Sequence, residues 1–439
     1  MNKNRKRIAK LFYLAVLCSS LIISTKSFCQ NYSFSGGSWY IKGNFKNVTV
    51  YSINGVFSFI KPDKIDSTID LKGKYCIPPF GDAHTHNLDG GFNLKEMVTK
   101  YLKEGVFYVQ VLGNNGEGSK AVRPALEKSK KIDVTYANGL LTSTYGHGFY
   151  PYEPLAMGIY APYLQIKYAD SIKKSRLVEN KAYYFLDTKE DVDAKWQLIM
   201  KYKPDHIKIC LSDAKNYPEK RRLEKADDNG LSEEVAAYVV QKAHKEGLRV
   251  FAHIETADDA RVCARIGVDV LAHLPGYFWD GREETKLKYC ITKKDVSLFK
   301  KVGLTVIPTI NIHGTTKYDS TGNPTFNQEN YIKVLKYKKE ILQALYKAKV
   351  SIALGGDYFG NTVAPEIDTL IKYNFFSNKE LLTIYSINTP QSIFPKRKIG
   401  EIKEGYEASF LVLQENPLLN IEAIKNILFR IKQGVFIKL

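Results

Sequence analysis

Strand-like and helix-like segments alternate along most of this chain of 439 residues. Amphipathic segments separate the strand-like runs, and one of them begins after Ser232 and stops at Gly247, which are good signals for a helix start and end. Eight such repeats predict an α/β chain folded as a (β/α)8 TIM barrel. A doubly wound sheet is the alternative, because periodicity fixes the alternation but not the closure. The eight predicted strands are 76–83, 106–112, 133–140, 206–211, 249–253, 268–273, 304–310 and 351–355.

The two ends of the chain carry short alternating runs that predict antiparallel β structure. Examples are "NVTVYSI" near the start and "ASFLVLQ" near the end. We expect both ends to form one small β-sandwich from residues 31–75 plus 397–439, with the barrel, residues 76–396, inserted between them. The connections after the third and seventh strands are unusually long, and long loops at strand ends often determine substrate specificity.

The first 30 residues resemble an export signal. Five basic residues precede the apolar run 11–23, which is too short for a membrane span of about 20 residues. We therefore expect a signal peptide over residues 1–30, an exported protein in the periplasm or outside the cell, and no stable membrane span after cleavage. Cys18 and Cys29 lack the small residue expected before a lipidated cysteine, so a lipoprotein is the weaker interpretation.

The charge and the cysteine content exclude few classes of partner or site. Removing residues 1–30 takes away six basic residues and no acidic residue, which lowers the net charge from +18 to +12. Such a surface favours anionic polymers or acidic substrates. No block of Lys and Arg alternates with aromatics, so we expect no nucleic-acid partner. There is no CxxC spacing, so a thiolate metal site is not expected, and a homo-oligomer is left open.

Residues with metal-ligand side chains stand at or near the ends of the predicted strands. A parallel barrel places the residues that carry out chemistry at the carboxyl ends of its strands. This layout predicts a metal-assisted hydrolase. The residues are His84, His86, Lys208, His253, His273 and Asp357.

Taken singly, these positions differ in what they indicate. His84 and His86 point to the same face of a strand, because side chains alternate with period two, so both can reach one ion. Asp82 has the same parity and could orient one imidazole. Lys208 lies between isoleucines, where an ammonium is costly to bury. It either meets solvent or an acid at the strand end, or it reacts with CO2 to form a carbamate that bridges two cations.

The remaining positions are weak signals alone. His253 and His273 each end an apolar strand, where an isolated histidine is more often a core residue. Asp357 follows two glycines, and a carboxylate there can serve as metal ligand and general base. His206 shares the parity of Lys208 but is expected deeper in the barrel, in a structural role.

The joint pattern resembles the amidohydrolase superfamily, in particular its two-metal members with a carboxylated lysine, such as imidazolonepropionase-like and Xaa-Pro dipeptidase-like enzymes. "STIDLKGKYCIPPFGDAHTHN" is similar to the superfamily's passage into the barrel. "TPQSIFPKRKIGEIKEGYEASFLVLQENPL" is similar to its return to the sheet domain. The resemblance covers nearly all of the chain after the leader.

The resemblance implies a role for each ligand. His84, His86 and Asp357 would bind the more buried metal, and His253 and His273 the more exposed one. Carboxylated Lys208 and a hydroxide would bridge the two divalent ions, with zinc favoured and manganese or iron also suitable. Asp357 would pass a proton from the nucleophile to the leaving nitrogen.

Substrate contacts are expected in the loop after the third strand. His147 could donate a hydrogen bond to the substrate carbonyl, although a solvent-exposed loop histidine is an equal alternative. Tyr145 and Tyr277 are weaker candidates for the same role. His244 and His313 are expected to be non-catalytic.

The sequence therefore predicts a secreted, metal-dependent amidohydrolase. It would hydrolyse a C–N bond in a small amide, cyclic amide or dipeptide through a metal-bridging hydroxide. Alternatives are a mononuclear aminohydrolase (a deaminase) and a phosphoester or lactone hydrolase on the same barrel. A deaminase would normally lack the fourth-strand lysine and carry a glutamate three residues after the fifth-strand histidine. Here Glu255 lies two residues after His253. A non-enzymatic binding protein is a distant fourth.

Overall fold

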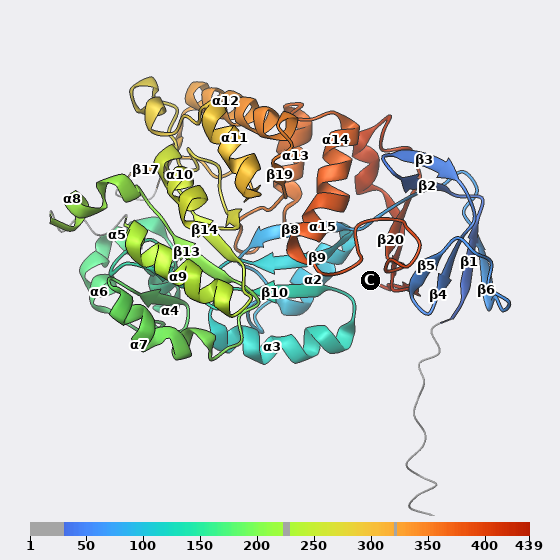
Figure 1. Cartoon of the computed structure of the whole chain (residues 1–439), viewed down its shortest axis with the longest axis horizontal. Coiled ribbons are helices and arrows are strands. Elements are labelled where there is room, and N and C mark those ends of the chain that lie inside the picture. The colour runs from blue at the N-terminus through green and yellow to red at the C-terminus, as the bar shows by residue number, and fades with distance from the viewer. Residues whose placement is uncertain (1–29, 223–228, 320–322) are drawn as a thin grey trace, which may run out of the picture.

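The computed structural model describes residues 30–222, 229–319 and 323–439 and shows a mixed α/β fold (Figure 1). Parallel strands lie at the centre and helices cover them, while the N-terminal strands lie beside C-terminal strand β20 (Phe410–Leu413) on one side. The helices are α2 (Leu94–Lys103), α3 (Gly116–Ser129), α4 (Phe149–Ala156), α5 (Pro162–Lys167), α6 (Ala169–Lys174), α7 (Lys189–Met200), α8 (Tyr217–Arg222), α9 (Glu233–Lys245), α10 (Ala257–Ile266), α11 (Lys293–Val302), α12 (Gln328–Lys347), α13 (Ala364–Lys372), α14 (Asn378–Thr383) and α15 (Thr389–Ile393).

Each of the eight predicted runs contains a parallel strand. They form two hydrogen-bonded sets, in the orders β10-β9-β8 and β12-β11-β13-β14-β15-β16-β19. The side chains of these strands are mostly apolar, and many are β-branched or aromatic. They are buried on both faces of the sheets, as is usual for parallel strands. The strands are β8 (Phe80–Thr85), β9 (Val106–Val111), β10 (Asp133–Tyr136), β11 (Leu140–Thr142), β12 (Tyr183–Phe185), β13 (Ile207–Cys210), β14 (Val250–His253), β15 (Val270–Leu271), β16 (Thr305–Val306) and β19 (Ser351–Ile352).

Backbone contacts connect the two parallel sets at both ends. The Ala83 amide donates to the Leu354 carbonyl at 2.8 Å, which joins β8 to the residues after β19. On the other side only residues 137–139 separate β10 from β11. Asn138 (φ 57°) and Gly139 (φ 120°) adopt left-handed backbone there, so the predicted third strand is interrupted. The sheets are consistent with the predicted barrel.

The predicted first strand, residues 76–83, is two strands in two different sheets. β7 (Tyr75–Ile77) pairs with β2 and β20, whereas β8 pairs with β9. Pro78 and Pro79 separate them, because proline has no backbone N–H to donate to a ladder. The break lets one segment pass directly from the small sheets into the parallel strands.

The small sheets pack face to face around an aromatic core. One has the order β5-β4-β1-β6 and the other the order β22-β21-β20-β7-β2-β3. Phe34, Trp39, Phe57 and Phe410 fill the space between them, with Phe34 and Phe410 in an edge contact at 4.9 Å. Their remaining strands are β1 (Tyr32–Ser35), β2 (Ser38–Ile41), β3 (Asn44–Asn47), β4 (Val50–Ile53), β5 (Val56–Ser58), β6 (Ser67–Asp70), β21 (Ile427–Lys432) and β22 (Val435–Phe436).

Capping signals in the sequence set several helix ends. Ser232 caps α9 by accepting a hydrogen bond from the Val235 amide, and Gly247 follows the helix with φ 72°. Thr256 and Thr292 begin α10 and α11 with full capping boxes. The long third connection contains α4, α5 and α6, and the seventh contains a hairpin of β17 (Thr316–Tyr318) and β18 (Pro324–Phe326).

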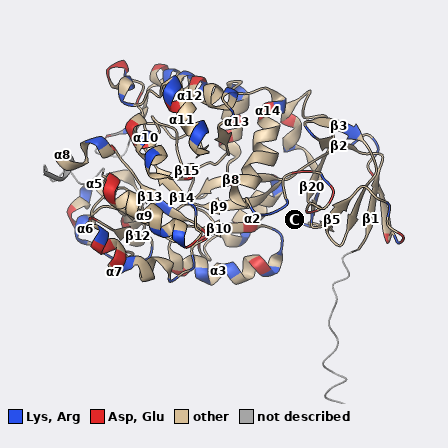
Figure 2. Cartoon of the chain, viewed as in Figure 1, with Lys and Arg blue, Asp and Glu red and all other residues tan. Residues whose placement is uncertain are grey.

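Charged residues of both signs are interspersed along outer helices such as α3, α6 and α7 (Figure 2). The central strands are largely uncharged, so Lys208 on β13 is an exception. Among the described residues, no helix combines the length and apolarity needed to cross a membrane. The four described cysteines are free, and Cys76, Cys210 and Cys263 are buried. The predicted signal peptide, with Cys18 and Cys29, falls on residues 1–30, of which 1–29 lie outside the described residues.

Candidate metal centre

One cavity of about 120 Å³ at the carboxyl ends of the parallel strands brings the predicted ligands together. All six proposed ligands line it, and so does His147 from the third connection. The six ligands are His84, His86, Lys208, His253, His273 and Asp357. Leu112, Leu140 and Phe359 add apolar walls.

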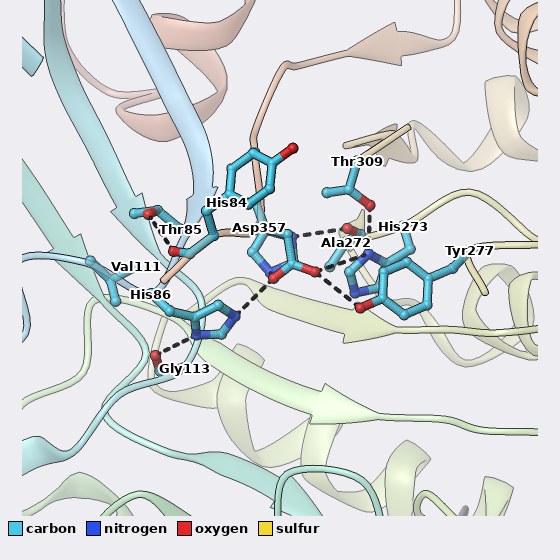
Figure 3. A network of polar contacts seen from close by, with 12 residues as sticks. His84, Thr85, His86, Val111, Gly113, Ala272, His273, Tyr277, Thr309 and Asp357 are labelled. Atoms are coloured by element: carbon cyan, nitrogen blue, oxygen red, sulfur yellow. Dashed lines mark hydrogen bonds and ion pairs between the residues drawn. The ribbon is translucent and has the colours of Figure 1, made fainter. Parts of the chain in front are cut away.

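Asp357 lies at the middle of the cluster (Figure 3). Its Oδ1 is 3.1 Å from the Nε2 of His84 and 2.9 Å from the Nε2 of His86. Its Oδ2 accepts a hydrogen bond from the Tyr277 hydroxyl at 3.2 Å and is 4.0 Å from the Nδ1 of His273. Donor atoms of His84, His273 and Asp357 all lie within 4.8 Å of one another, a spacing that could hold a metal ion.

Hydrogen bonds at the other ring nitrogens fix the tautomers of two histidines. The Nδ1 of His84 is 3.0 Å from the Ala272 carbonyl, and that of His86 is 2.9 Å from the Gly113 carbonyl. A carbonyl only accepts hydrogen bonds, so both Nδ1 atoms carry the proton and a neutral ring keeps a lone pair on Nε2. Burial lowers the pKa of His84 to about 4, so its ring is neutral at neutral pH.

The Nε2 atoms of both rings therefore face the same carboxylate oxygen. The neutral His84 ring points its lone pair at that oxygen, and two electron-rich atoms 3.1 Å apart repel each other unless they share a cation. Tetrahedral zinc with bonds of about 2.0–2.1 Å places its ligand atoms roughly 3.3 Å apart. The chemistry of His84, His86 and Asp357 thus fits a divalent metal, and the backbone carbonyls orient the rings as supporting groups do in metal sites.

The backbone around Gly355 holds β8 and Asp357 in close contact. A Cβ at Gly355 would lie 2.4 Å from the His84 amide nitrogen, so only glycine fits. The Asp357 amide then donates to the His84 carbonyl at 2.7 Å, and Asp357 adopts φ 57°. Asp82 bonds to the backbone amides of His84 and Gly356 at 3.2 and 3.3 Å. Asp82 was expected to orient an imidazole, but it secures the backbone of both ligand segments instead.

The remaining histidines stack beside Asp357. His253 lies over His147 with ring centroids 3.8 Å apart, and its ring is 4.6 Å from that of His273. The Nδ1 of His273 contacts the Thr309 hydroxyl at 2.8 Å. Burial lowers the pKa of His253 and of His273 well below the ordinary value, and that of His147 to about 3. These rings are therefore neutral near pH 7, the form that binds metals.

Lys208 is the most unusual group in the cavity. Its side chain is 3% exposed, and its Nζ has no hydrogen-bond partner among the residues that the structure describes. Burial lowers the pKa of Lys208 to about 7, although Asp357 acts in the opposite direction. Lys208 contacts neither solvent nor a hydrogen-bonding acid. The interpretation that it meets solvent or an acid at the strand end is therefore not supported.

Comparison with known proteins identifies the fold. The chain superposes on a Xaa-Pro dipeptidase with a TM-score of 0.67 and 17% identity, covering 93% of this chain and all of the other. Ochratoxinase from Aspergillus niger gives a TM-score of 0.67 and 20% identity, over 93% and 96% of the two chains. Molinate hydrolase gives a TM-score of 0.65 and 15% identity, over 93% of this chain and 95% of the other.

The fold is that of an amidohydrolase. The predicted resemblance to the amidohydrolase superfamily is thus confirmed at the level of the fold. In sequence, the chain is 25% identical to Aspergillus niger ochratoxinase over 208 residues, which are 45% of this chain and 40% of that protein. No family model matches this chain.

Several residues of this cavity were not predicted. The Tyr152 hydroxyl lies 2.9 Å from the Nδ1 of His86, and Phe359 stacks on the His86 ring with centroids 4.6 Å apart. Thr309, which contacts His273, ends the seventh predicted strand. All three lie near strand ends or in the connections that follow them, where we expect residues that determine substrate specificity. Their residue types alone did not indicate a place in the cavity.

Other predicted positions lie outside the cavity. Tyr145, a weak candidate, contacts Phe149 and Phe185 and accepts a hydrogen bond from Arg176 at 2.9 Å. His206 is buried with its Nε2 3.2 Å from the Val111 carbonyl, consistent with the structural role expected. The non-catalytic candidates His244 and His313 contact Asp269 and Thr315.

Proposed function

We propose that this protein is a metal-dependent hydrolase that cleaves a C–N bond in a small amide, cyclic amide or dipeptide. The observation that carries the proposal is the convergence of two imidazole Nε2 atoms on one oxygen of Asp357. An amidohydrolase fold with that cluster at its strand ends supports the same conclusion. The neighbours named as a dipeptidase and as ochratoxinase support the choice of amide or peptide substrates.

We assign the ligands as the superfamily resemblance implies. His84, His86 and Asp357 would hold one ion, and His253 and His273 the second. Lys208 would bridge them after carboxylation: its neutral amine attacks the carbon of CO2 and loses one proton, which leaves a carbamate anion. Its pKa near 7 supports this step, because a useful fraction of the amine is unprotonated at neutral pH.

Two divalent ions, with zinc favoured, would lower the pKa of an attacking water and polarise the scissile carbonyl. The protein side chains carry out the proton transfers. Asp357 would accept the proton of the attacking water and deliver it to the leaving nitrogen. His147, which stacks on His253, and Tyr277, which contacts Asp357, would donate hydrogen bonds to the substrate carbonyl.

Finer features of the fold and location belong to the same proposal. The backbone link between Ala83 and Leu354 supports closure into a (β/α)8 barrel. The shared core of the small sheets supports a β-sandwich from residues 31–75 and 397–439 around a catalytic barrel at 76–396. We also propose export to the periplasm or beyond, directed by the leader at residues 1–30.

Metal analysis of the purified protein tests the central claim, with two equivalents of metal expected. Lys208→Ala should reduce the metal content, and added short-chain carboxylic acids should restore part of it and part of the activity. Lys120→Ala, an exposed lysine on α3, is the matched control and should leave both unchanged. Full metal content in Lys208→Ala would reject the bridging role, and no bound metal in the unmodified protein would reject the function.

A mononuclear aminohydrolase is the second candidate. The donor atoms of His84, His273 and Asp357 form one compact group, which favours a single ion. One equivalent of metal, with ammonia released from an aminated ring substrate and no cleavage of acyclic amides, would decide for the deaminase.

A further inference from the structure

A second cavity of about 590 Å³ opens beside the metal centre. Residues of α4, α5 and α6 form most of its wall, and Phe359 from the loop after β19 stands among them. These helices lie within the long third connection. The cavity is lined by His147, Tyr150, Pro151, Leu155, Gln165, Ala169 and Phe359.

The two cavities adjoin and share part of their walls. His147, Pro151 and Phe359 line both of them. His147 also stacks on His253, and Phe359 stacks on His86 at an interplanar angle of 13°. A molecule that reaches the metal ligands can therefore extend one of its substituents along Phe359 into the second cavity.

The described lining of the second cavity carries no charged side chain, since none of its residues is an Asp, Glu, Lys or Arg. Phe359, which stacks on the predicted ligand His86, is 52% exposed. An aromatic group exposed at the mouth of a site is typical of a binding surface.

We propose that this cavity, here called the α4–α6 pocket, binds an uncharged aromatic or bulky apolar substituent of the amide substrate. The inference rests on the proposed function, because it places the scissile bond in the metal-lined cavity. The α4–α6 pocket is open to solvent, and its volume exceeds that of a closed cavity of about 150 Å³ that holds a benzene ring, so a phenyl group fits against its wall. The charged side chain of a dipeptide has no counter-ion among its described lining residues.

Binding measurements test the pocket without relying on catalysis. We expect 3-phenylpropanamide to bind the metal-loaded protein in calorimetry or saturation-transfer NMR, and propanamide, which lacks the ring, to bind at least about tenfold more weakly. Ala169→Trp, at an exposed position on α6, should fill the pocket and weaken binding of the phenyl probe by a similar factor. Ala156→Trp, exposed on α4 but outside both cavities, is the matched control.

A second variant distinguishes a change in the pocket from a local change in folding. Leu155→Glu places a carboxylate in the pocket and should weaken the phenyl probe in the same way, with an unchanged circular-dichroism spectrum. Equal affinity of both amides for the unmodified protein would overturn the proposal. So would a phenyl affinity that neither variant alters.

Kinetics separate this inference from the proposed function. The two amides share one leaving group, so a ratio of kcat/KM of about tenfold in favour of the phenyl compound measures the pocket alone. If both are hydrolysed at equal kcat/KM, the hydrolase stands and the pocket assignment is wrong. If neither is hydrolysed but Ala169→Trp still weakens phenyl binding, the pocket stands and the amide substrate is wrong.

Discussion

Replacing Lys338 with methionine should destabilise the protein by about 3–5 kcal/mol. Lys338 lies on α12 and is fully buried. Its Nζ donates hydrogen bonds to the carbonyls of Ile312 at 2.5 Å, Ile310 at 3.1 Å and Tyr277 at 3.4 Å. From the other side, Glu366 accepts hydrogen bonds from the amides of Ile310 and Asn311 at 2.8 and 3.1 Å. A buried amine and a buried carboxyl group thus hold opposite polar groups at the end of the seventh strand, and burial lowers the pKa of Lys338 to about 7 and raises that of Glu366 to about 8.

The magnitude follows from these contacts. A buried carbonyl left without a donor costs about 1–3 kcal/mol, and two of the three carbonyls here accept short hydrogen bonds from Lys338. Methionine has a similar length and shape, so little of the loss comes from a cavity.

Urea unfolding followed by tryptophan fluorescence measures the effect. Lys336→Met is the control, because Lys336 lies on the same helix and is exposed. We also expect Lys338→Met to weaken metal binding, since Thr309 contacts His273 immediately before Ile310. A free energy of unfolding within about 1 kcal/mol of the control would refute the reasoning, because it would mean that the three carbonyls are equally well satisfied without the ammonium.

Three further outcomes are expected. Gly355→Ala should cost about 1–3 kcal/mol and lower metal affinity, because the new Cβ meets the His84 backbone; an unchanged melting temperature and metal content would contradict this. Asp357→Asn should keep much of its metal but lower kcat about 100-fold or more, and unchanged turnover would remove Asp357 from the mechanism. Glu407→Gln should cost about 1–3 kcal/mol at neutral pH, because Glu407 accepts hydrogen bonds from Arg397 and Tyr108. The pKa of Glu407 is lowered in the fold, where Lys432 and Arg397 outweigh burial, so this stabilisation is complete above pH 4.5 and is lost as the pH falls further. The difference from Glu415→Gln, at an exposed position, should therefore shrink in acid unfolding experiments, and a pH-independent difference would count against the ionised form.

The sequence contained enough information to locate most of the parallel strands and the cluster, but not β12, which lies within the predicted third connection. Ligand-type residues at strand ends converge because parallel strands end at one edge, so His84, His253 and Asp357 needed no contact information to be grouped. Their roles stay predictions, since chemistry is not visible in the arrangement alone. The break at Pro78 and Pro79 was also present in the sequence, as two residues that cannot extend a ladder.

Other features depend on tertiary contacts. Lys338 stands in the run "KVLKYKKE", which looks like an ordinary solvated helix face. Its helical spacing from Val334, Ile341 and Leu345 nevertheless places it on the buried side of α12, and this was the available signal. Tyr152 lies on the short helix α4 and Phe359 in a loop, and neither segment is long enough or regular enough for a hydrophobic period to reveal what these residues face.

The prolines between β7 and β8 have a consequence for how the chain matures during synthesis. β8 carries His84 on a segment whose preceding residues pair with β20, near the very end of the chain. The ribosome therefore synthesises His84 some 330 residues before it synthesises β20, the strand that pairs with the residues preceding β8. A nascent chain or a product shortened at its carboxyl end would hold His84 without its final anchorage, so we expect the proposed metal to bind late in biogenesis.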